Sequence, residues 1–426
     1  MNLLNSRRKE LLSSYPICQV ISFMVSRVVS SRCLACSILT RWRYPRGDSP
    51  VACLNRRLKC RELSPASPAR SSIWRFSENR DSIRHWAFNT AGYPATESGV
   101  ELRILKRLFT EQEARIAQGL TMLPEAPEAI SERLQSDPDE LADTLAEMAG
   151  KGLIFRVSKD GTNLYSAAQF VIGIWEYHLN DLDEELIRDV NEYLPLVMKE
   201  QWNQTDTKQL RVIPVSQKVN AEMNITSYDM AEEIIRSQSK IVVSPCICRK
   251  EHQMAGKGCD NPLEVCLSFG TGAYYYEQNG LGRSIDQKEA LEVLEKGREA
   301  GLVLQPGNSK RPMNICMCCG CCCQVLKNLK DFENPANEVH TNYFARVDAD
   351  ECVACEDCVE RCHMEAIVVD DTARVLENRC IGCGACITAC PTDALQFHQK
   401  DEADRYEPPQ NVFETYMKMA QERGLV

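Results

Sequence analysis

The sequence predicts a multidomain protein of the α+β class, with helices in its first half and cysteine-rich loops in its second. The chain has 426 residues, enough for two to four domains with hydrophobic cores. Apolar residues recur with helical spacing through much of residues 98–240, broken by a few short strand-like runs. Of the 23 cysteines, none falls between residues 61 and 245, and eighteen lie from Cys246 to Cys390. Such clustering is typical of soft-metal ligands rather than of disulfides spread over a fold.

The charge divides the chain into a basic leader and an acidic body. Residues 1–93 carry a net charge of +11 and the remainder carries −21, so the overall −10 averages two unlike segments. An acidic body repels polyanions, which argues against nucleic acid as a partner. No segment reaches the roughly 20 consecutive apolar residues that a membrane-spanning helix needs. We therefore expect no membrane span and a cytoplasmic location.

Residues 1–93 show no sustained helix or strand periodicity, and three interpretations remain open. An arginine- and serine-rich, acid-poor N-terminus is typical of an organelle transit peptide. Cys33-x-x-Cys36 offers a pair of metal ligands. The third interpretation is a disordered or wrongly included extension, with the true start near residues 85–100. An abrupt change of composition at residues 96–98 favours this third interpretation.

Residues 94–170 are predicted to form three helices followed by a β-hairpin. The last helix begins at Asp137-Pro138, an N-cap with proline at the first helical position, and ends at Gly150. Two short strands then flank a turn at residues 159–161. This order of elements resembles a winged helix-turn-helix domain.

The candidate recognition helix of this domain argues against DNA binding. It contains Asp139, Glu140, Asp143 and Glu147 and no basic residue. A recognition helix lies beside phosphates, which would repel these carboxylates. We therefore expect a packing or partner-docking module.

Residues 171–240 are predicted to be a helical linker or adaptor, with amphipathic helices in residues 174–194 and 227–238 and a strand at residues 211–215. A second strand, at residues 240–243, leads into the first cysteines of the body. The aromatic residues expected in the core are Trp175, Tyr177 and Trp202.

Residues 241–335 are predicted to be a cysteine-rich metal-binding region. Its ten cysteines form two sets separated by a predicted helix in residues 285–303, which would return the chain so that the sets can meet. The first set is Cys246, Cys248, Cys259 and Cys266, and the second is Cys316, Cys318, Cys319, Cys321, Cys322 and Cys323. Six cysteines in eight residues invite oxidation unless a metal occupies them.

Residues 340–400 contain an internal cysteine repeat with an offset of 28 residues. The two copies are Cys352, Cys355, Cys358 and Cys362, and Cys380, Cys383, Cys386 and Cys390, the last followed by Pro391. This is the spacing that ligates cubane [4Fe–4S] clusters, whereas zinc sites usually use cysteine pairs with a longer gap. The segment resembles a bacterial-type 2[4Fe–4S] ferredoxin domain.

The resemblance implies two [4Fe–4S] clusters with ligands exchanged between the copies. Cluster I would take Cys352, Cys355, Cys358 and Cys390, and cluster II would take Cys380, Cys383, Cys386 and Cys362. His363 departs from the family, which usually has proline there; it either tunes the cluster or is an ordinary surface histidine. Gly382 and Gly384 are expected to let the backbone approach the cubane. Strands are predicted at residues 366–370 and 373–376, and residues 401–426 as a C-terminal helix.

We also expect one or two further Fe–S clusters in the middle region. The first set of four cysteines is the simplest ligand set, and residues 316–323 complete that cluster or hold a second one. A zinc site or a redox thiol pair is the alternative. Cys318-Cys319-Gly320 is similar to an element of heterodisulfide-reductase-type subunits, but the distant partners and repeat of that family are missing. The whole pattern resembles multicluster ferredoxin-like proteins of anaerobic bacteria.

These patterns favour an electron carrier, or an electron-transfer subunit of an anaerobic oxidoreductase, that docks redox proteins through a basic surface on the partner. A redox-sensing regulator is one alternative, and an Fe–S reductase acting at residues 246–323 is another. No catalytic residue is predicted, because the sequence has no dinucleotide or phosphate loop and no nucleophile–base constellation.

Overall fold

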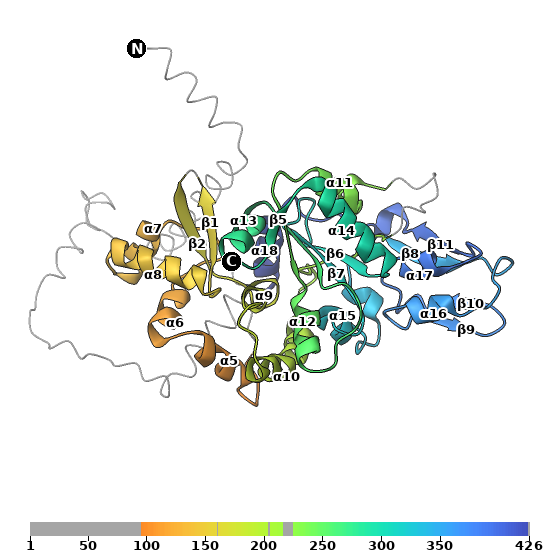
Figure 1. The fold of residues 1–426 in the computed structure, drawn as a ribbon, viewed down its shortest axis with the longest axis horizontal. Coiled ribbons are helices and arrows are strands. Elements are labelled where there is room, and N and C mark those ends of the chain that lie inside the picture. Colours follow the sequence, from red (N-terminus) through yellow and green to blue (C-terminus); the bar gives the residue numbers. More distant parts are fainter. Residues whose placement is uncertain (1–94, 160, 203–204, 216–224, 425–426) are drawn as a thin grey trace, which may run out of the picture. The chain divides into compact units, whose positions relative to one another are not determined.

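A computed structural model of the chain describes residues 95–159, 161–202, 205–215 and 225–424 (Figure 1). All of them belong to one unit of the chain, Trp74–Val426. The interpretations of residues 1–93, including the Cys33-x-x-Cys36 pair, lie outside the described residues. Among the helices described, none combines the length and the apolar character needed to cross a membrane.

The described chain begins with four helices and a hairpin; the sequence predicts the hairpin and three of the helices, and the helix at Glu111–Gln118 is additional. Thr110 and Glu113 form a reciprocal capping box at the start of α6, and the Asp137 carboxylate caps α8. Asp139, Glu140, Asp143 and Glu147 are all exposed on α8. The winged-helix assignment stays a prediction. The elements are α5 Val100–Leu108, α6 Glu111–Gln118, α7 Pro127–Leu134, α8 Pro138–Gly150, β1 Phe155–Lys159 and β2 Thr162–Ser166.

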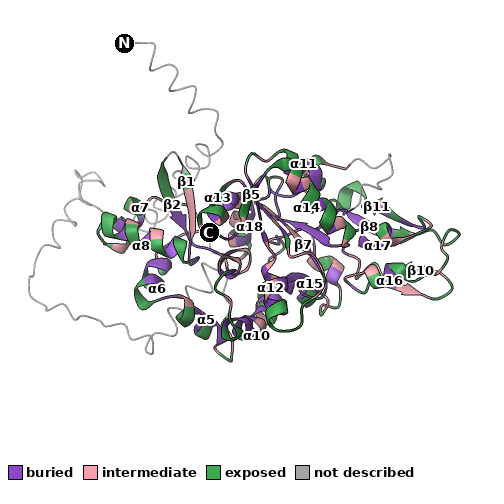
Figure 2. Ribbon diagram, viewed as in Figure 1, coloured by how far each residue is buried: buried purple, intermediate pink, exposed green. Residues whose placement is uncertain are grey.

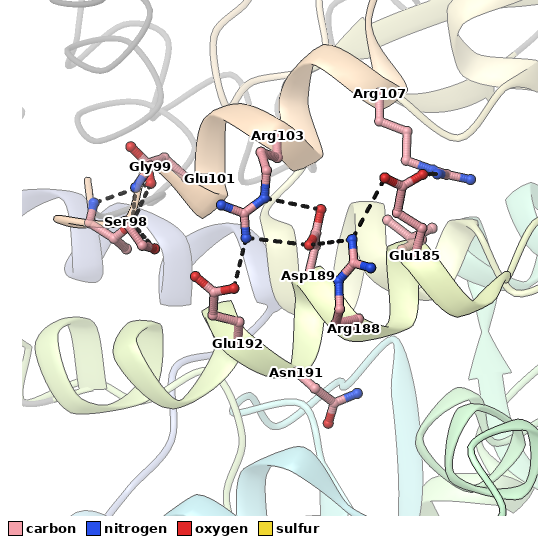
Figure 3. Close-up of polar contacts among 12 residues, drawn as sticks. Ser98, Gly99, Glu101, Arg103, Arg107, Glu185, Arg188, Asp189, Asn191 and Glu192 are labelled. Atoms are coloured by element: carbon pink, nitrogen blue, oxygen red, sulfur yellow. Dashed lines mark hydrogen bonds and ion pairs between the residues drawn. The ribbon is translucent and has the colours of Figure 1, made fainter.

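Ion pairs fasten α5 to the long helix α10, Glu184–Gln201. Arg103 contacts Asp189 at 3.3 Å and Glu192 at 2.7 Å, and Asp189 is 4 % exposed. Figure 3 shows these side chains between the two helices, with Asn191 on a side of α10 that points away from α5. One face of α10 therefore holds the N-terminal helices while another faces the cysteine-rich region.

The adaptor differs from its prediction in two places. The helix expected over residues 174–194 is broken: η2 (Phe170–Ile174) and α9 (Trp175–Tyr177) are short, and α10 restarts where Asp183 caps it. The strand expected at residues 211–215 is wrong, because this segment makes isolated bridges and Pro214 has no N–H to donate. Downstream lie η4 Ser227–Asp229 and α11 Ala231–Arg236, within the predicted helix.

Of the three aromatic residues expected in the core, Trp175 is 2 % exposed and belongs to it. Tyr177 and Trp202 are partly buried and pack against the core from its edge.

The middle cysteines lie in and around a five-stranded antiparallel sheet of order β5-β3-β4-β7-β6. Strands β5 and β7 of this sheet are labelled in Figures 1 and 2. Its strands are β3 Ile241–Pro245, β4 Glu264–Phe269, β5 Arg283–Ile285, β6 Val303–Pro306 and β7 Asn314–Cys318. Its helices are α12 Ile247–Met254, α13 Gly270–Gln278, α14 Gln287–Glu299 and α15 Gln324–Leu329. Because β4 pairs with both β3 and β7, cysteines distant in sequence meet at one end of the sheet.

The C-terminal segment has two short helices between paired strands, followed by a helix that lies within residues 401–426. Its strands are β8 Tyr343–Val347, β9 Ile367–Val369, β10 Ala373–Val375 and β11 Leu395–Gln399, with β8 paired to β11 and β9 to β10. Its helices are η5 Pro335–Glu338, α16 Asp357–Arg361, α17 Ala385–Ala389, η6 Glu402–Asp404 and α18 Val412–Glu422. Strands β9 and β10 confirm the two predicted here.

Candidate metal centres

The eight cysteines of the C-terminal repeat line two separate cavities. Quartet I lines one cavity and consists of Cys352, Cys355, Cys358 and Cys390. Quartet II lines the other and consists of Cys362, Cys380, Cys383 and Cys386. Each cavity takes three thiols from one copy of the repeat and the fourth from the other copy. The structure thus brings together the ligand sets that the ferredoxin resemblance implies.

The two copies also share an unusual backbone. Left-handed φ angles occur at Ala354 (53°), Glu356 (67°) and Glu365 (54°), and 28 residues later at three matching positions. These are Gly382 (66°), Gly384 (76°) and Asp393 (57°). A non-glycine residue adopts this region at a cost of about 1–2 kcal/mol, so the surrounding fold must enforce it. The repeat is therefore one of backbone conformation as well as of cysteine spacing.

The two glycines of the second copy also pack closely against the neighbouring strands. A Cβ atom at Gly382 would collide with the carbonyl oxygen of Tyr343, and one at Gly384 would collide with the Phe397 ring. Both neighbours lie on the paired strands β8 and β11. The glycines thus allow the loop of quartet II to pack against protein, as well as to turn.

Backbone N–H groups point at several of these sulfur atoms. Ala366 donates to Cys362 Sγ at 3.2 Å, and Ala373 donates to Cys352 Sγ at 3.3 Å. Burial raises the pKa of the Cys390 thiol, but N–H groups led by that of Leu395 outweigh it, and the net pKa is lowered. Donors of this kind stabilise thiolate, the form that ligates iron.

His363 joins quartet II to the middle cysteines. Its Nδ1 accepts from the Gly320 N–H at 3.2 Å, and its Nε2 donates to the Gly301 carbonyl at 2.7 Å. Burial lowers its pKa, which favours the neutral ring that can accept at one nitrogen and donate at the other. Histidine in place of the usual proline therefore makes a contact with the loop of residues 319–323.

The ten middle cysteines divide into four and six. Cys259, Cys319, Cys321 and Cys322, here called the four-thiol site, have all their Sγ atoms within 4.8 Å of one another. The other six, here called the six-thiol site, line one cavity and consist of Cys246, Cys248, Cys266, Cys316, Cys318 and Cys323. The simplest set predicted from the sequence is therefore not brought together as a unit, because Cys259 lies with the second set.

The thiols of the six-thiol site form an arc. Along the cavity wall each thiol interacts electrostatically with the next, in the order Cys266, Cys316, Cys318, Cys323, Cys248 and Cys246. Gln324 lines the same cavity. Its side chain donates to Asn191 at 2.9 Å and to Glu251 at 2.6 Å, and these hydrogen bonds connect α15 to α10 and α12. The sheet supplies Cys266, Cys316 and Cys318. The other three lie at helix starts: Cys246 and Cys323 precede α12 and α15, and Cys248 is in the first turn of α12.

The surroundings of Arg249 indicate whether the middle cysteines suit a metal. Its side chain is fully buried and donates to the carbonyl oxygens of Pro262 and Met317, while its Nε has no partner. No carboxylate pairs with it in the part of the chain that the structure describes. Burial lowers the pKa of Arg249, but the charges of Cys246, Cys319 and Cys318 outweigh it and raise the pKa.

A buried guanidinium needs negative charge beside it, and isolated neutral thiols supply none. Metal-bound thiolates do supply it, so the surroundings of Arg249 fit metal sites among the middle cysteines.

Glu176 is a feature that the sequence did not indicate. It lines the cavity of the six-thiol site, and its carboxylate accepts from the Gly173 N–H at 2.9 Å. Burial raises its pKa to about 7. The preceding Ile172 has a left-handed φ of 54°, which is a strained conformation for a β-branched residue. No sequence motif in this segment predicts a carboxylate at the site, because only the tertiary structure brings Glu176 there.

A larger pocket of about 290 Å³ adjoins the six-thiol site. Ile172 and Tyr276 line both spaces and form the wall between them. Most of the pocket is apolar, but Asn308 Oδ1 and Ser309 Oγ are buried there and have no hydrogen-bond partner.

A family model described as a 4Fe–4S binding domain matches residues 373–396. This span contains the last four cysteines of the repeat, from Cys380 to Cys390. The protein is an iron–sulfur protein. Its C-terminal segment contains a ferredoxin-type domain of the kind that binds a [4Fe–4S] cofactor. No curated protein and no solved structure matches the chain.

Proposed function

We propose that this iron–sulfur protein transfers electrons through three clusters. Two would be [4Fe–4S] clusters held by quartets I and II, and the third would be an Fe–S cluster in the six-thiol site. The observation that carries the proposal is the pair of matched thiol quartets, each around a cavity and each with the same left-handed backbone positions. An iron–sulfur cluster, when bound, accepts and releases single electrons.

The packing of the chain supports a continuous route. Cys358 of quartet I and Cys386 of quartet II are buried in one hydrophobic cluster. Cys318 and Cys323 of the six-thiol site are buried in another cluster, against which Cys362 of quartet II packs. Quartet II thus lies between quartet I and the six-thiol site, and the intervening side chains exclude water.

Quartet I is the end that a redox partner would reach. Cys355 is exposed, and the neighbouring Val353 is 62 % exposed. Exposed carboxylates surround them: Asp348, Asp350, Glu351, Glu356, Asp357, Glu360, Asp370 and Asp371. A partner with a basic surface would be steered to this end, as the acidic composition of the body leads us to expect.

Metal analysis of the anaerobically purified full-length chain tests the proposal. Three cubane-sized clusters require about twelve iron and twelve acid-labile sulfide per chain. About eight of each would show that the six-thiol site holds no cluster, and about four or fewer would overturn the proposal. Cys266→Ser, which removes one thiol of the arc, should lower iron while the EPR signals of quartets I and II remain.

The pocket beside the six-thiol site favours a second candidate function, reduction of a small organic molecule. The pocket volume suits a compact ring system, and the unpartnered Asn308 and Ser309 atoms would orient a hydroxyl or carbonyl group. Electrons would arrive from the six-thiol site through the wall formed by Ile172 and Tyr276. The docked partner protein would supply them.

Binding of 2-naphthol, which combines an apolar ring system with one hydroxyl, tests the second candidate. Calorimetry should show saturable binding, and the EPR spectrum of one cluster should change when the pocket is filled. Ala168→Trp, which places a large ring in the pocket wall, should abolish both effects. If neither effect occurs, electron transfer to a protein partner is the better account.

A further inference from the structure

The four-thiol site has the dimensions of a site for a single metal ion. The Cys259 Sγ lies 3.9 Å from the Cys319 Sγ and 3.6 Å from the Cys322 Sγ, and the Cys321 and Cys322 sulfurs are 3.8 Å apart. Four thiolates around one tetrahedral zinc ion, each about 2.3 Å from the metal, lie about 3.8 Å from one another. These three separations match that edge length, and the other three pairs of sulfur atoms lie within 4.8 Å.

The proposed cluster sites differ from the four-thiol site in the spacing of their sulfur atoms. Among the residues that the structure describes, the four-thiol site is the one group of three or more ligand side chains whose donor atoms all lie within 4.8 Å. Quartets I and II instead surround cavities, and the six thiols form an open arc around a third. A cubane occupies the space between its ligands, whereas a single ion needs its ligands almost in contact.

We infer that Cys259, Cys319, Cys321 and Cys322 bind one zinc ion in a closed tetrahedral site. Zinc prefers four sulfur ligands of this geometry in structural sites and leaves no open position there. The inference goes beyond the proposed electron transfer, because zinc carries no electron.

The surroundings of the four thiols suit a charged zinc–thiolate centre. The Asn261 side-chain N–H donates to Cys259 Sγ at 3.4 Å, a contact that orients a ligand sulfur. Cys319 and Cys322 are fully buried, and the fully buried Arg249 lies beside Cys319. A zinc ion with four thiolates carries a net charge of −2, which the guanidinium partly balances.

The zinc site would stabilise the loop of residues 319–322, which lies between the six-thiol site and quartet II. Cys318 and Cys323, both in the six-thiol site, immediately flank the zinc ligands, and Gly320 lies among them. A Cβ atom at Gly320 would come within 2.7 Å of the His363 carbonyl oxygen, so this loop packs tightly against quartet II. Zinc bound to this loop would therefore hold the six-thiol site and quartet II in place relative to each other.

The test is zinc and iron analysis of the full-length chain, purified anaerobically from medium that contains both metals. The wild type should hold about one zinc per chain, and Cys259→Ser should lower it at least about tenfold. Cys266→Ser is the matched control: it removes a thiol of the six-thiol site and should leave zinc unchanged. Absence of zinc from the wild type, or loss of iron without loss of zinc in Cys259→Ser, overturns the inference.

Cys321 allows a second variant that misfolding cannot imitate. Its side chain is exposed, so a histidine fits, and three cysteines with one histidine form a common structural zinc site. Cys321→His should keep about one zinc per chain, and Cys321→Ser should lose it. Equal zinc loss in both variants overturns the inference. Iron content reports on the proposed clusters separately, so their failure is distinguishable from failure of the zinc site.

Discussion

The C-terminal repeat and the middle cysteine region group their thiols by different means. In the repeat, three ligands of each quartet lie within seven residues of sequence, so the local spacing brings them together. In the middle region, β4 and β7 bring Cys266 and Cys316 together, and Cys259 reaches across to the loop of residues 319–323. Spacing thus predicts a cofactor when its ligands are local, and tertiary structure decides when they are not.

Replacement of Arg249 should have the largest effect and bears on the middle region alone. If thiolates bind metal on either side of it, Arg249→Met leaves their charge unbalanced and lowers the free energy of unfolding by about 3–5 kcal/mol. Urea unfolding under anaerobic conditions measures this. If the thiols are neutral and metal-free, the same change removes an unpaired buried charge, and the protein becomes more stable. Arg115→Met, at an exposed position on α6, is the control and should change stability by less than about 0.5 kcal/mol.

The matched backbone positions give a test within the repeat. Gly382→Ala should lower the free energy of unfolding by about 2–3 kcal/mol, because the new methyl group meets the Tyr343 carbonyl and φ is left-handed. The equivalent residue in the other copy, Ala354, already has a side chain there. Ala354→Gly should therefore raise stability, by up to about 1 kcal/mol. Thermal unfolding of the two variants checks the opposite signs, and equal effects would contradict the matched loop geometry.

His363 tests how the two regions are joined. His363→Pro restores the residue usual in ferredoxins and removes two hydrogen bonds, to Gly320 and Gly301, at a cost of about 1–3 kcal/mol. The quartet II signal in EPR should persist, while electron transfer between quartet II and the six-thiol site slows in stopped-flow reduction. His363→Gln keeps a donor and an acceptor and should recover part of the rate. An unchanged rate in His363→Pro would show that the contact has no part in the route.

The acidic rim of quartet I should show the smallest effect. Asp350→Lys and Glu360→Lys weaken the attraction of a basic partner, so the rate of reduction by a basic cytochrome should fall about two- to tenfold at low salt. At high ionic strength, where charges are screened, the variants and the wild type should converge. Lys288→Glu, an exposed charge change on α14, is the control. A loss of rate that salt does not reduce would place docking elsewhere.

The sequence allowed much of the repeat to be predicted and less of the middle region. Strands β9 and β10, helices α8 and α14 and the ferredoxin-type character of the C-terminal segment follow from local patterns. The split of ten thiols into four and six does not, because it depends on the register of β4 and β7 and on the path of the chain around Cys259. Glu176 and Arg249 could not be recognised either, since burial rather than residue type gives each its role.

The central claim is that three thiol groups hold iron and a fourth holds zinc. Anomalous scattering from crystals of the anaerobically purified chain, recorded on both sides of the iron and zinc absorption edges, tests it most directly. We predict iron peaks within quartet I, quartet II and the six-thiol site, and one zinc peak among Cys259, Cys319, Cys321 and Cys322. Iron among those four cysteines, or no metal in the six-thiol site, would contradict the account.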